Sequence, residues 1–404
     1  MTKVLPPNYQ NNNGYTGSYP DFGLYVHWPY CQSKCPYCDF NSHVAETIDH
    51  ERFALAYERE LSVLSERLPG RRLATIFFGG GTPSLMQPET VHRVISTARR
   101  LWPQRNDIEI TMEANPGSVE AGRLAEFRGA EVDRISLGVQ SFDEAALSFL
   151  GRRHSVEEAR KAIEIAQNTF ERVSFDLIYA RPDQTAAEWR QELSQALEIA
   201  GEHLSVYQLT IEPGTAFEPR HARGEFSIPG DDLGGSLYEM TQELLEAAGR
   251  PAYEVSNHAR PGTECRHNLI YWRQGEYLGI GPGAHGRLNT IESGQRRAIR
   301  AHRAPAIWLD RVETSGHGLV EDEVLDRDMV LSEVLMMGLR LAEGVPRDRL
   351  VGVTGQDLEQ IAGDERIKQL VDAGYFWTND TDFGATASGR QRLDGILSHL
   401  LANS

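Results

Sequence analysis

Three cysteines stand within the stretch Cys31-Gln32-Ser33-Lys34-Cys35-Pro36-Tyr37-Cys38, just after an apolar run that ends at Trp28. The whole chain of 404 residues has only four cysteines. Thiolate is the preferred ligand of iron–sulfur iron and of zinc, so thiols this close together indicate a metal centre. Three sulfurs leave one position open in a tetrahedral site or a four-iron cube, and an open position is where a metal site does chemistry.

Other uses of three cysteines fit the sequence less well. A disulfide would leave one thiol unpaired, and such bonds are rare in a reducing cytosol. A structural zinc site usually has a second pair of cysteines, which this chain lacks. His27 or His43 could still complete a zinc site, so zinc remains an alternative to an iron–sulfur cluster at this point.

Composition restricts the class of protein. The chain is 40% hydrophobic and 25% charged, as expected for a globular protein, and its formal net charge is −17. That acidity argues against nonspecific binding of nucleic acid. No apolar stretch approaches the ~20 residues that cross a bilayer. Residues 1–20 lack the basic start and apolar centre of a signal peptide and are predicted to be a flexible arm. We therefore expect a cytoplasmic, reducing location.

Residues 21–215 alternate β-rich runs with helical patterns, which predicts an α/β fold with a parallel sheet. Six repeats are too few for a closed eight-stranded barrel, so we expect a partial (β/α)6 barrel with its site at the C-terminal strand ends. The predicted strands are Gly23–Trp28, Leu73–Phe78, Ile108–Glu113, Arg134–Val139, Val173–Tyr179 and Leu204–Leu209. Helical patterns include Ile48–Leu68 and Ala186–Ile199.

The remaining chain divides into two predicted regions. Residues 216–325 are predicted to be a connector that covers the barrel mouth and carries a segment rich in glycine and aromatic residues, His267–Gly286. Residues 326–404 are predicted to be a helical C-terminal domain with a hairpin, resembling a winged helix. We see no basic recognition face there, so DNA binding is the less favoured alternative for this domain.

Residues suited to ligand binding follow the predicted strands. Consecutive glycines at a strand end let the backbone approach a ligand closely, and a tight turn is the alternative explanation. A carboxylate within an apolar strand is costly unless it is paired. An arginine offers a fork for a carboxylate. The residues are Gly80, Gly81, Thr82, Glu113, Gln140, Arg152 and Asp176.

The Cys-x3-Cys-x2-Cys spacing resembles the radical S-adenosylmethionine (SAM) superfamily, and the match to its proteins related to oxygen-independent coproporphyrinogen III oxidase spans nearly the whole chain. The resemblance implies that Cys31, Cys35 and Cys38 hold a 4Fe-4S cluster whose open iron takes the amino and carboxylate groups of SAM. The SAM contacts that it implies are Tyr25, Tyr37 (through its backbone), Gly80, Gly81, Thr82, Glu113, Gln140, Arg152 and Asp176.

Two features favour a heme-chaperone branch of this group over the oxidases. The oxidases have a further cysteine two residues after the third, where this chain has Phe40. The segment His267-Asn268-Leu269-Ile270-Tyr271-Trp272 matches the HNxxYW motif of the chaperone branch. Imidazole can ligate heme iron and aromatic rings can wall a porphyrin, so we expect heme contacts at His267, Asn268, Tyr271 and Trp272. Cys265 and His285 are alternative iron ligands. A capping role for His267 beside an aromatic interface is the competing interpretation.

The resemblance therefore implies a heme chaperone that binds heme, carries a SAM-liganded 4Fe-4S cluster and transfers heme to acceptor proteins such as membrane-bound respiratory enzymes. It also implies an electron donor for the cluster and peripheral membrane contact during heme delivery. The alternative is an enzyme of porphyrin biosynthesis, which would use a SAM-derived radical to decarboxylate coproporphyrinogen III oxidatively.

Overall fold

The computed structural model describes residues 21–290 and 293–402, so the arm predicted at 1–20 lies outside the described residues. The described residues contain an 11-stranded sheet in the order β11-β10-β9-β8-β1-β2-β3-β4-β5-β6-β7. Neighbouring strands are parallel from β8 to β6. The strands are β1 (Asp21–Trp28), β2 (Arg72–Gly80), β3 (Gln104–Ala114), β4 (Arg134–Gln140), β5 (Arg172–Tyr179), β6 (His203–Gln208), β7 (Asn257–Ala259), β8 (Glu276–Ile280), β9 (His285–Asn289), β10 (Arg296–Ala301) and β11 (Leu319–Val324).

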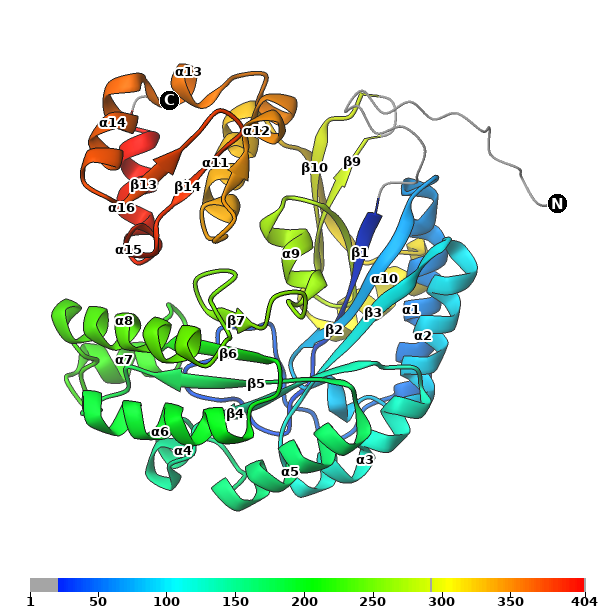
Figure 1. Cartoon of the computed structure of the whole chain (residues 1–404). Coiled ribbons are helices and arrows are strands. Elements are labelled where there is room, and N and C mark those ends of the chain that lie inside the picture. Colours follow the sequence, from blue (N-terminus) through cyan, green and yellow to red (C-terminus); the bar gives the residue numbers. More distant parts are fainter. Residues whose placement is uncertain (1–20, 291–292, 403–404) are drawn as a thin grey trace.

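Helices cover the outer face of this curved sheet, which confirms the predicted partial barrel of α/β type (Figure 1). Each of the six predicted strands is present as one of β1–β6. The helical segments of this part are α1 (His50–Leu64), η1 (Ser65–Arg67), η2 (Pro83–Leu85), α2 (Pro88–Leu101), α3 (Ser118–Gly129), α4 (Glu144–Phe149), α5 (Val156–Thr169), α6 (Ala186–Ile199), α7 (Phe217–Ala222), α8 (Asp231–Ala247), α9 (Arg266–Trp272) and α10 (Pro305–Ser315).

Local sequence explains where the covering helices begin. Ser155 and Glu158 form a capping box at the start of α5, and Thr185 and Glu188 form another at the start of α6. In each box two backbone N–H groups that the helix leaves unpaired find side-chain acceptors. The buried faces of these helices then pack on the sheet in one large apolar core.

The stretch predicted as a connector, 216–325, contributes strands β7 to β11 to the same sheet. β8 lies parallel to β1, and β9, β10 and β11 continue antiparallel from it. Leu278, Ile299 and Trp308 from this stretch are buried in the main core. These strands are short and most of them are rich in charged residues, so their sequence lacks the apolar pattern that marks β1–β6.

The C-terminal residues form a second apolar core and a small three-stranded sheet in the order β12-β14-β13. Figure 1 shows this unit above the open side of the main sheet, in orange and red. An ion pair between Arg340 and Glu254 (2.9 Å) joins it to the main body. Its elements are α11 (Arg327–Gly338), β12 (Val345–Pro346), α12 (Arg347–Thr354), α13 (Leu358–Ala362), α14 (Asp364–Asp372), β13 (Phe376–Thr378), β14 (Asp382–Ala385), α15 (Ala387–Arg390) and α16 (Leu393–Leu400). In the described part of the chain, no helix has the length and apolarity that a membrane crossing requires.

Candidate functional site

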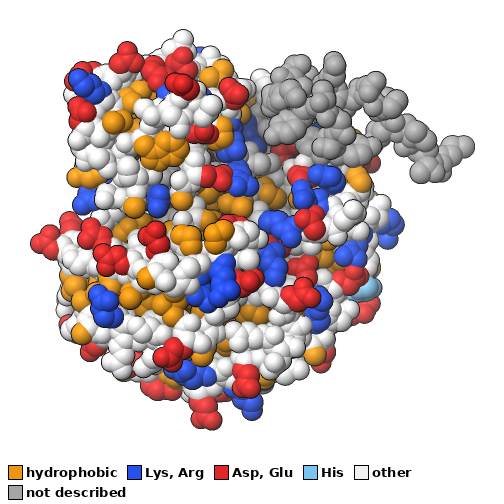
Figure 2. Space-filling model, viewed as in Figure 1, with side chains coloured by type: hydrophobic (Ala, Val, Ile, Leu, Met, Phe, Trp, Pro, Cys, Tyr) orange, Lys and Arg blue, Asp and Glu red, His pale blue; other side chains and the backbone are white. Residues whose placement is uncertain are grey.

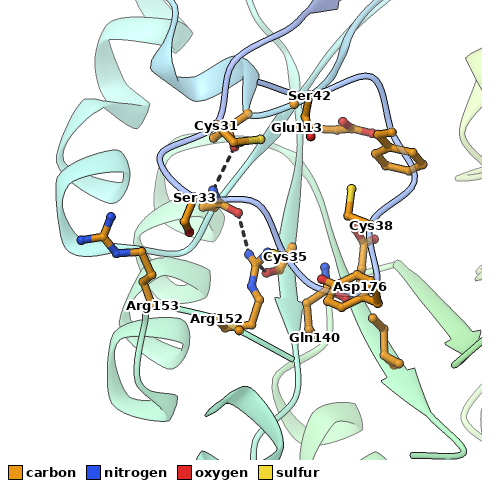
Figure 3. A pocket seen from close by; sticks show the side chains of 18 of the residues that line it. Cys31, Ser33, Cys35, Cys38, Ser42, Glu113, Gln140, Arg152, Arg153 and Asp176 are labelled. Atoms are coloured by element: carbon orange, nitrogen blue, oxygen red, sulfur yellow. Dashed lines mark hydrogen bonds between the residues drawn. The ribbon is translucent and has the colours of Figure 1, made fainter. Parts of the chain in front are cut away.

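A cavity of about 560 Å³ opens at the C-terminal ends of the parallel strands, and the three clustered cysteines line it. Figure 3 shows their side chains projecting from the loop after β1, with Arg152 below them and Glu113, Gln140 and Asp176 on the strand side. Because the carboxyl ends of parallel strands meet at one edge of a sheet, residues distant in sequence converge here.

Backbone hydrogen bonds fix the cysteine loop. The N–H of Cys31 donates to the carbonyl of His43 (2.9 Å), which closes the loop at its base. At the far side, the N–H of Phe217, the first residue of α7, donates to the carbonyl of Pro36 (2.9 Å). The loop is therefore held from both ends while its thiols remain partly exposed to the cavity.

The thiols lie in an environment that suits thiolate ligands of a cluster. The hydroxyl of Thr82 donates to Cys31 Sγ (3.4 Å), and the Arg152 guanidinium donates to Cys35 Sγ (3.3 Å). Burial, with the neighbouring thiols adding to it, raises the pKa of Cys38 to about 11. Deprotonation is therefore unfavourable without a metal, and cationic iron would offset that cost.

The zinc alternative from the sequence names two histidines. His27 is almost fully buried and bonded at both ring nitrogens, to Asn41 O (2.9 Å) and to the hydroxyl of Tyr25 (3.1 Å). His43 Nε2 lies 3.3 Å from the side-chain oxygen of Asn41. Within residues 21–290 and 293–402, no three His, Cys, Asp or Glu side chains converge on a single metal ion, as a zinc site would require.

Two half-buried carboxyl groups in the same cavity, Glu113 and Asp176, form no ion pair with any residue that the structure describes. Burial, followed by the nearby Asp176, raises the pKa of Glu113 to about 8. Burial likewise raises the pKa of Asp176 to about 6, although Ser205, Arg134 and Ser136 counteract it. Acids this costly to ionise suit a ligand that brings positive charge and hydroxyl donors, and the ammonium, sulfonium and ribose of SAM supply both.

Gln140 and Arg152 also have unused polar atoms. Gln140 Oε1 and Arg152 Nε are buried without a hydrogen-bond partner among the described residues. Gln140 has a φ of 73°, a strained conformation for a residue with a side chain. Strain and orphaned polar atoms gather where a ligand completes a site. These observations, with the raised pKa values of Glu113 and Asp176, fit SAM at the cavity.

The glycine run at the end of β2 allows close packing of the backbone, in addition to the ligand approach that the sequence suggested. The N–H of Gly81 donates to Trp28 O (2.7 Å), and that of Gly80 donates to a carboxylate oxygen of Glu113 (3.2 Å). These donors therefore serve the protein itself. A Cβ on Gly81 would lie 2.7 Å from Tyr30 O, so the run allows β2 to pass closely beside the start of the cysteine loop.

Replacement of Gly81 by alanine is expected to destabilise the protein by ~1–3 kcal/mol, because the new methyl group would meet backbone rather than a movable side chain. Chemical unfolding measures the change. Gly122→Ala in α3 is the matched control, since nothing lies within 4 Å of its added Cβ and alanine favours helix. Equal stabilities of the two variants would contradict the packing role.

The structure brings nearly all of the predicted SAM residues to this cavity. Tyr25 is the exception, because its ring lines a second, adjoining cavity. Sequence reasoning missed Asn115, which accepts from Arg152 (2.5 Å), and Ser136 and Tyr207, which line the cavity beside Asp176. Neutral residues within strands or just after them give no distinctive sequence signal. The predicted SAM residues that line the first cavity are Tyr37, Gly80, Gly81, Thr82, Glu113, Gln140, Arg152 and Asp176.

The second cavity, of about 550 Å³, lies between α9, β9, β10 and α11. Tyr271 and Trp272 of the HNxxYW segment line it, whereas His267 lies behind the wall, fully buried. The His267 ring nitrogens are bonded to Thr75 Oγ1 (2.7 Å) and the Tyr271 hydroxyl (2.6 Å). The structure therefore places His267 against Thr75 and Tyr271 rather than on the cavity, and a direct heme contact of His267 stays a prediction.

Cys265 and Asn268 also lie away from the second cavity wall. The Cys265 thiol is buried against Glu109 (3.6 Å), and burial raises its pKa to about 11. Asn268 Nδ2 donates to the hydroxyl of Tyr253 (3.4 Å). A protonated, buried thiol is a poor ligand for iron. His285, by contrast, is exposed and lines the second cavity.

Comparisons with known proteins agree with this geometry. The Radical SAM superfamily model matches residues 25–196, and the HemN C-terminal domain model matches residues 325–392. The fold and the site thus define a radical SAM protein, a class that implies a 4Fe-4S cluster and SAM. The heme chaperone HemW of Escherichia coli (strain K12) is 38% identical over 389 residues, covering 95% of this chain and 99% of that protein. The chain therefore belongs to the HemW family, which confirms the resemblance seen in the sequence.

Two further relatives extend the comparison. Radical S-adenosyl methionine domain-containing protein 1, mitochondrial, of Danio rerio is 36% identical over 383 residues, or 94% of this chain and 86% of that protein. The coproporphyrinogen III oxidase HemN from Escherichia coli has a TM-score of 0.79 and 20% sequence identity, covering 96% of this chain and 91% of that chain. At that identity the likeness to HemN shows the fold alone.

Proposed function

We propose that this protein is a heme chaperone that binds heme, holds a SAM-liganded 4Fe-4S cluster and passes heme to acceptor proteins. The observation that carries the proposal is the pair of adjoining cavities. One is lined by the three thiols and by Glu113 and Asp176. The other is lined by Tyr271 and Trp272 of the HNxxYW segment. Asp39, Phe40, Gly80 and Glu113 line both, so ligands in the two cavities would be neighbours.

Within the first cavity, Cys31, Cys35 and Cys38 would hold the cluster. Arg152 would orient it, because its guanidinium is fixed by Gly138 O (2.8 Å) while it donates to Cys35. Glu113 and Asp176 would accept hydrogen bonds from a cationic ligand. When bound, cluster and SAM supply one-electron reductive cleavage of a sulfonium carbon–sulfur bond. An electron donor is therefore a further proposed partner.

The residue two positions after the third cysteine supports a chaperone over an oxidase. Phe40 is 57% exposed and projects no sulfur or acid toward either cavity that it lines. A large apolar side chain open to solvent suits contact with an apolar ligand or partner. We further propose that the protein acts in the cytoplasm and approaches the membrane peripherally when it delivers heme to respiratory acceptors.

Spectroscopic titration of the anaerobically reconstituted protein with hemin tests the proposal. A saturable Soret band with one heme per chain is expected, and transfer to an apo-acceptor should remove it. Incubation with coproporphyrinogen III, SAM and a reductant is expected to give no decarboxylated product. Turnover of coproporphyrinogen III would instead favour the oxidase alternative, and the absence of heme binding would refute the proposal.

A further inference from the structure

The second cavity has a strongly cationic floor that no part of the proposed function has used. In the antiparallel pair of β9 and β10, His285 lies opposite Arg300, Arg287 opposite Ala298, and Asn289 opposite Arg296. Directly opposed residues share a face, and alternate residues along a strand share it too. His285, Arg287, Arg296 and Arg300 therefore project from one face, and all four line the cavity. Figure 2 shows Lys and Arg side chains beside apolar ones in the hollow below the C-terminal unit.

Two arginines of this cavity, Arg296 and Arg303, form no ion pair with a carboxylate in the described part of the chain. Arg296 Nε is buried without a hydrogen-bond partner among the described residues, and its Nη2 donates only to Gly275 O (3.0 Å). Burial lowers the pKa of Arg296, as expected for a cation whose charge is poorly compensated. Arg303 is exposed at the rim, where its guanidinium forms no hydrogen bond or ion pair with any described residue.

The other two arginines are already paired at the cavity edges. Arg287 binds Glu333 of α11 (2.8 Å), and Arg300 binds Glu321 of β11. The free positive charge is therefore concentrated on Arg296 and Arg303. Buried guanidinium groups without anions are rare, and carboxylate or phosphate oxygens are the partners that their planar fork fits.

The walls above this floor are aromatic and apolar. Tyr271 and Trp272 of α9, Tyr277 of β8 and Met337 of α11 line the cavity. The exposed Phe40 lies on the wall shared with the first cavity. Aromatic walls over a cationic floor suit a flat apolar ligand that carries carboxylates on one edge, and heme with its two propionates has that form.

An iron ligand is available at the same site. His285 is exposed and projects into the cavity from the same face as Arg287 and Arg300, and imidazole is a competent axial ligand of heme iron. Arg296 lies opposite Asn289, four residues farther along β9, or roughly 13 Å along the strand. Such a separation lets a central iron and an edge carboxylate be held at the same time.

We propose that heme occupies the second cavity, with its propionates on Arg296 and Arg303 and with the His285 imidazole as an axial ligand of its iron. This inference rests on the proposed heme-binding function, and it adds where the heme binds and how it is oriented. Gly80 and Glu113 on the shared wall would place the porphyrin beside the SAM cavity. The Asn41 side chain, which donates to Pro282 O (2.8 Å) and Arg303 O (3.0 Å), ties the cysteine loop to this site.

The test compares hemin with hemin dimethyl ester, which lacks the two charges. In the R296Q/R303Q double variant, the affinity for hemin is expected to fall at least tenfold, or ~1.4 kcal/mol, while affinity for the ester stays unchanged. R297Q is the matched control. It neighbours Arg296 on β10, but it projects from the opposite face and binds Asp322 (2.8 Å), which also contacts Arg67. Unchanged hemin affinity, or equal losses for hemin and ester, would overturn the propionate assignment.

Spectra of the bound ferric heme test the axial ligand. H285A is expected to alter the Soret band and the electron paramagnetic resonance signal, whereas H92A, a change in α2 outside both cavities, should keep both. The reverse pattern, or an unchanged H285A spectrum, would overturn the iron assignment. If R296Q/R303Q fails to fold, R303Q alone changes only an exposed side chain and should still lower the preference for hemin over its ester. A wild-type protein that binds no hemin would refute the proposed function itself.

Discussion

Replacement of Cys35 by serine is expected to remove nearly all iron from the protein. The wild type, reconstituted anaerobically, should hold about four irons per chain and be brown, as a cubane cluster requires. Cys35 is the thiol that Arg152 contacts (3.3 Å), so its loss removes a ligand and leaves the Arg152 guanidinium facing a hydroxyl. Iron analysis and the visible absorption spectrum measure the effect. Cluster loss should also abolish SAM binding through the amino and carboxylate groups.

Cys265→Ser is the matched control for this experiment. It removes the fourth cysteine of the chain, whose thiol faces Glu109 and lies outside both cavities. Its iron content should equal that of the wild type. Iron retained in Cys35→Ser, or about one zinc per chain in the wild type, would contradict a cluster held by the three loop thiols.

The sequence was sufficient to predict the parallel half of the sheet and the cysteine loop. Strands β1 to β6 carry β-rich segments with buried apolar residues between helical patterns, and that alternation is visible in one sequence. Strand ends then place Glu113, Gln140 and Asp176 at one edge, whatever the loop conformations are. The α/β fold that these patterns predict is confirmed by the structure.

The second cavity could not be predicted in the same way. It depends on β8 inserting beside β1 and on β9 and β10 bringing Arg296 and His285 to one face. The paired residues of β1 and β8 are some 250 positions apart in the sequence. No local periodicity specifies pairings at such a distance. Likewise, the burial of His267 follows from its contact with Thr75 of β2, which its motif does not reveal.

Two glutamates of this protein, Glu60 and Glu113, differ in how many hydrogen-bond donors the fold supplies to their carboxylates. Glu60 accepts hydrogen bonds from the backbone N–H groups of Gly281 (2.9 Å) and Gly318 (2.7 Å) and from the Trp308 indole. It joins α1 to the added strands, and all its partners are donors. Among the described residues, Glu113 accepts a single backbone N–H, from Gly80 (3.2 Å), and it lines both cavities. The fold therefore supplies the hydrogen bonds of the Glu60 carboxylate, whereas the Glu113 carboxylate keeps oxygen lone pairs available to a ligand.

Replacement of Glu113 by glutamine is accordingly expected to stabilise the ligand-free protein while weakening SAM binding. Folding raises the pKa of this carboxyl from 4.5 to about 8, so the folded state binds its proton more tightly than the unfolded state. Stability is thus lost as pH rises from about 4.5, and the full penalty, on the order of 2–5 kcal/mol, applies above about pH 8. Glutamine carries no charge and keeps an acceptor for Gly80, so the gain in stability should grow with pH over that range.

SAM affinity should fall by about ten- to a hundredfold in the same variant, since hydrogen bonds to charged groups are worth ~1.5–3 kcal/mol. Chemical unfolding at pH values below and above 8, with calorimetric titration of SAM, measures both effects. Glu60→Gln is the structural control: burial also raises the pKa of Glu60 to about 7, but an amide there would face an N–H donor of Gly281 or Gly318 at a cost of ~1–3 kcal/mol, and SAM affinity should stay unchanged. A Glu113→Gln protein that is less stable at high pH, or that binds SAM as the wild type does, would show that the acid is structural. A Glu113→Gln protein that is more stable but binds SAM more weakly would instead identify Glu113 as a ligand-binding residue. The ligand-free protein would then be more stable without the negative charge of this side chain.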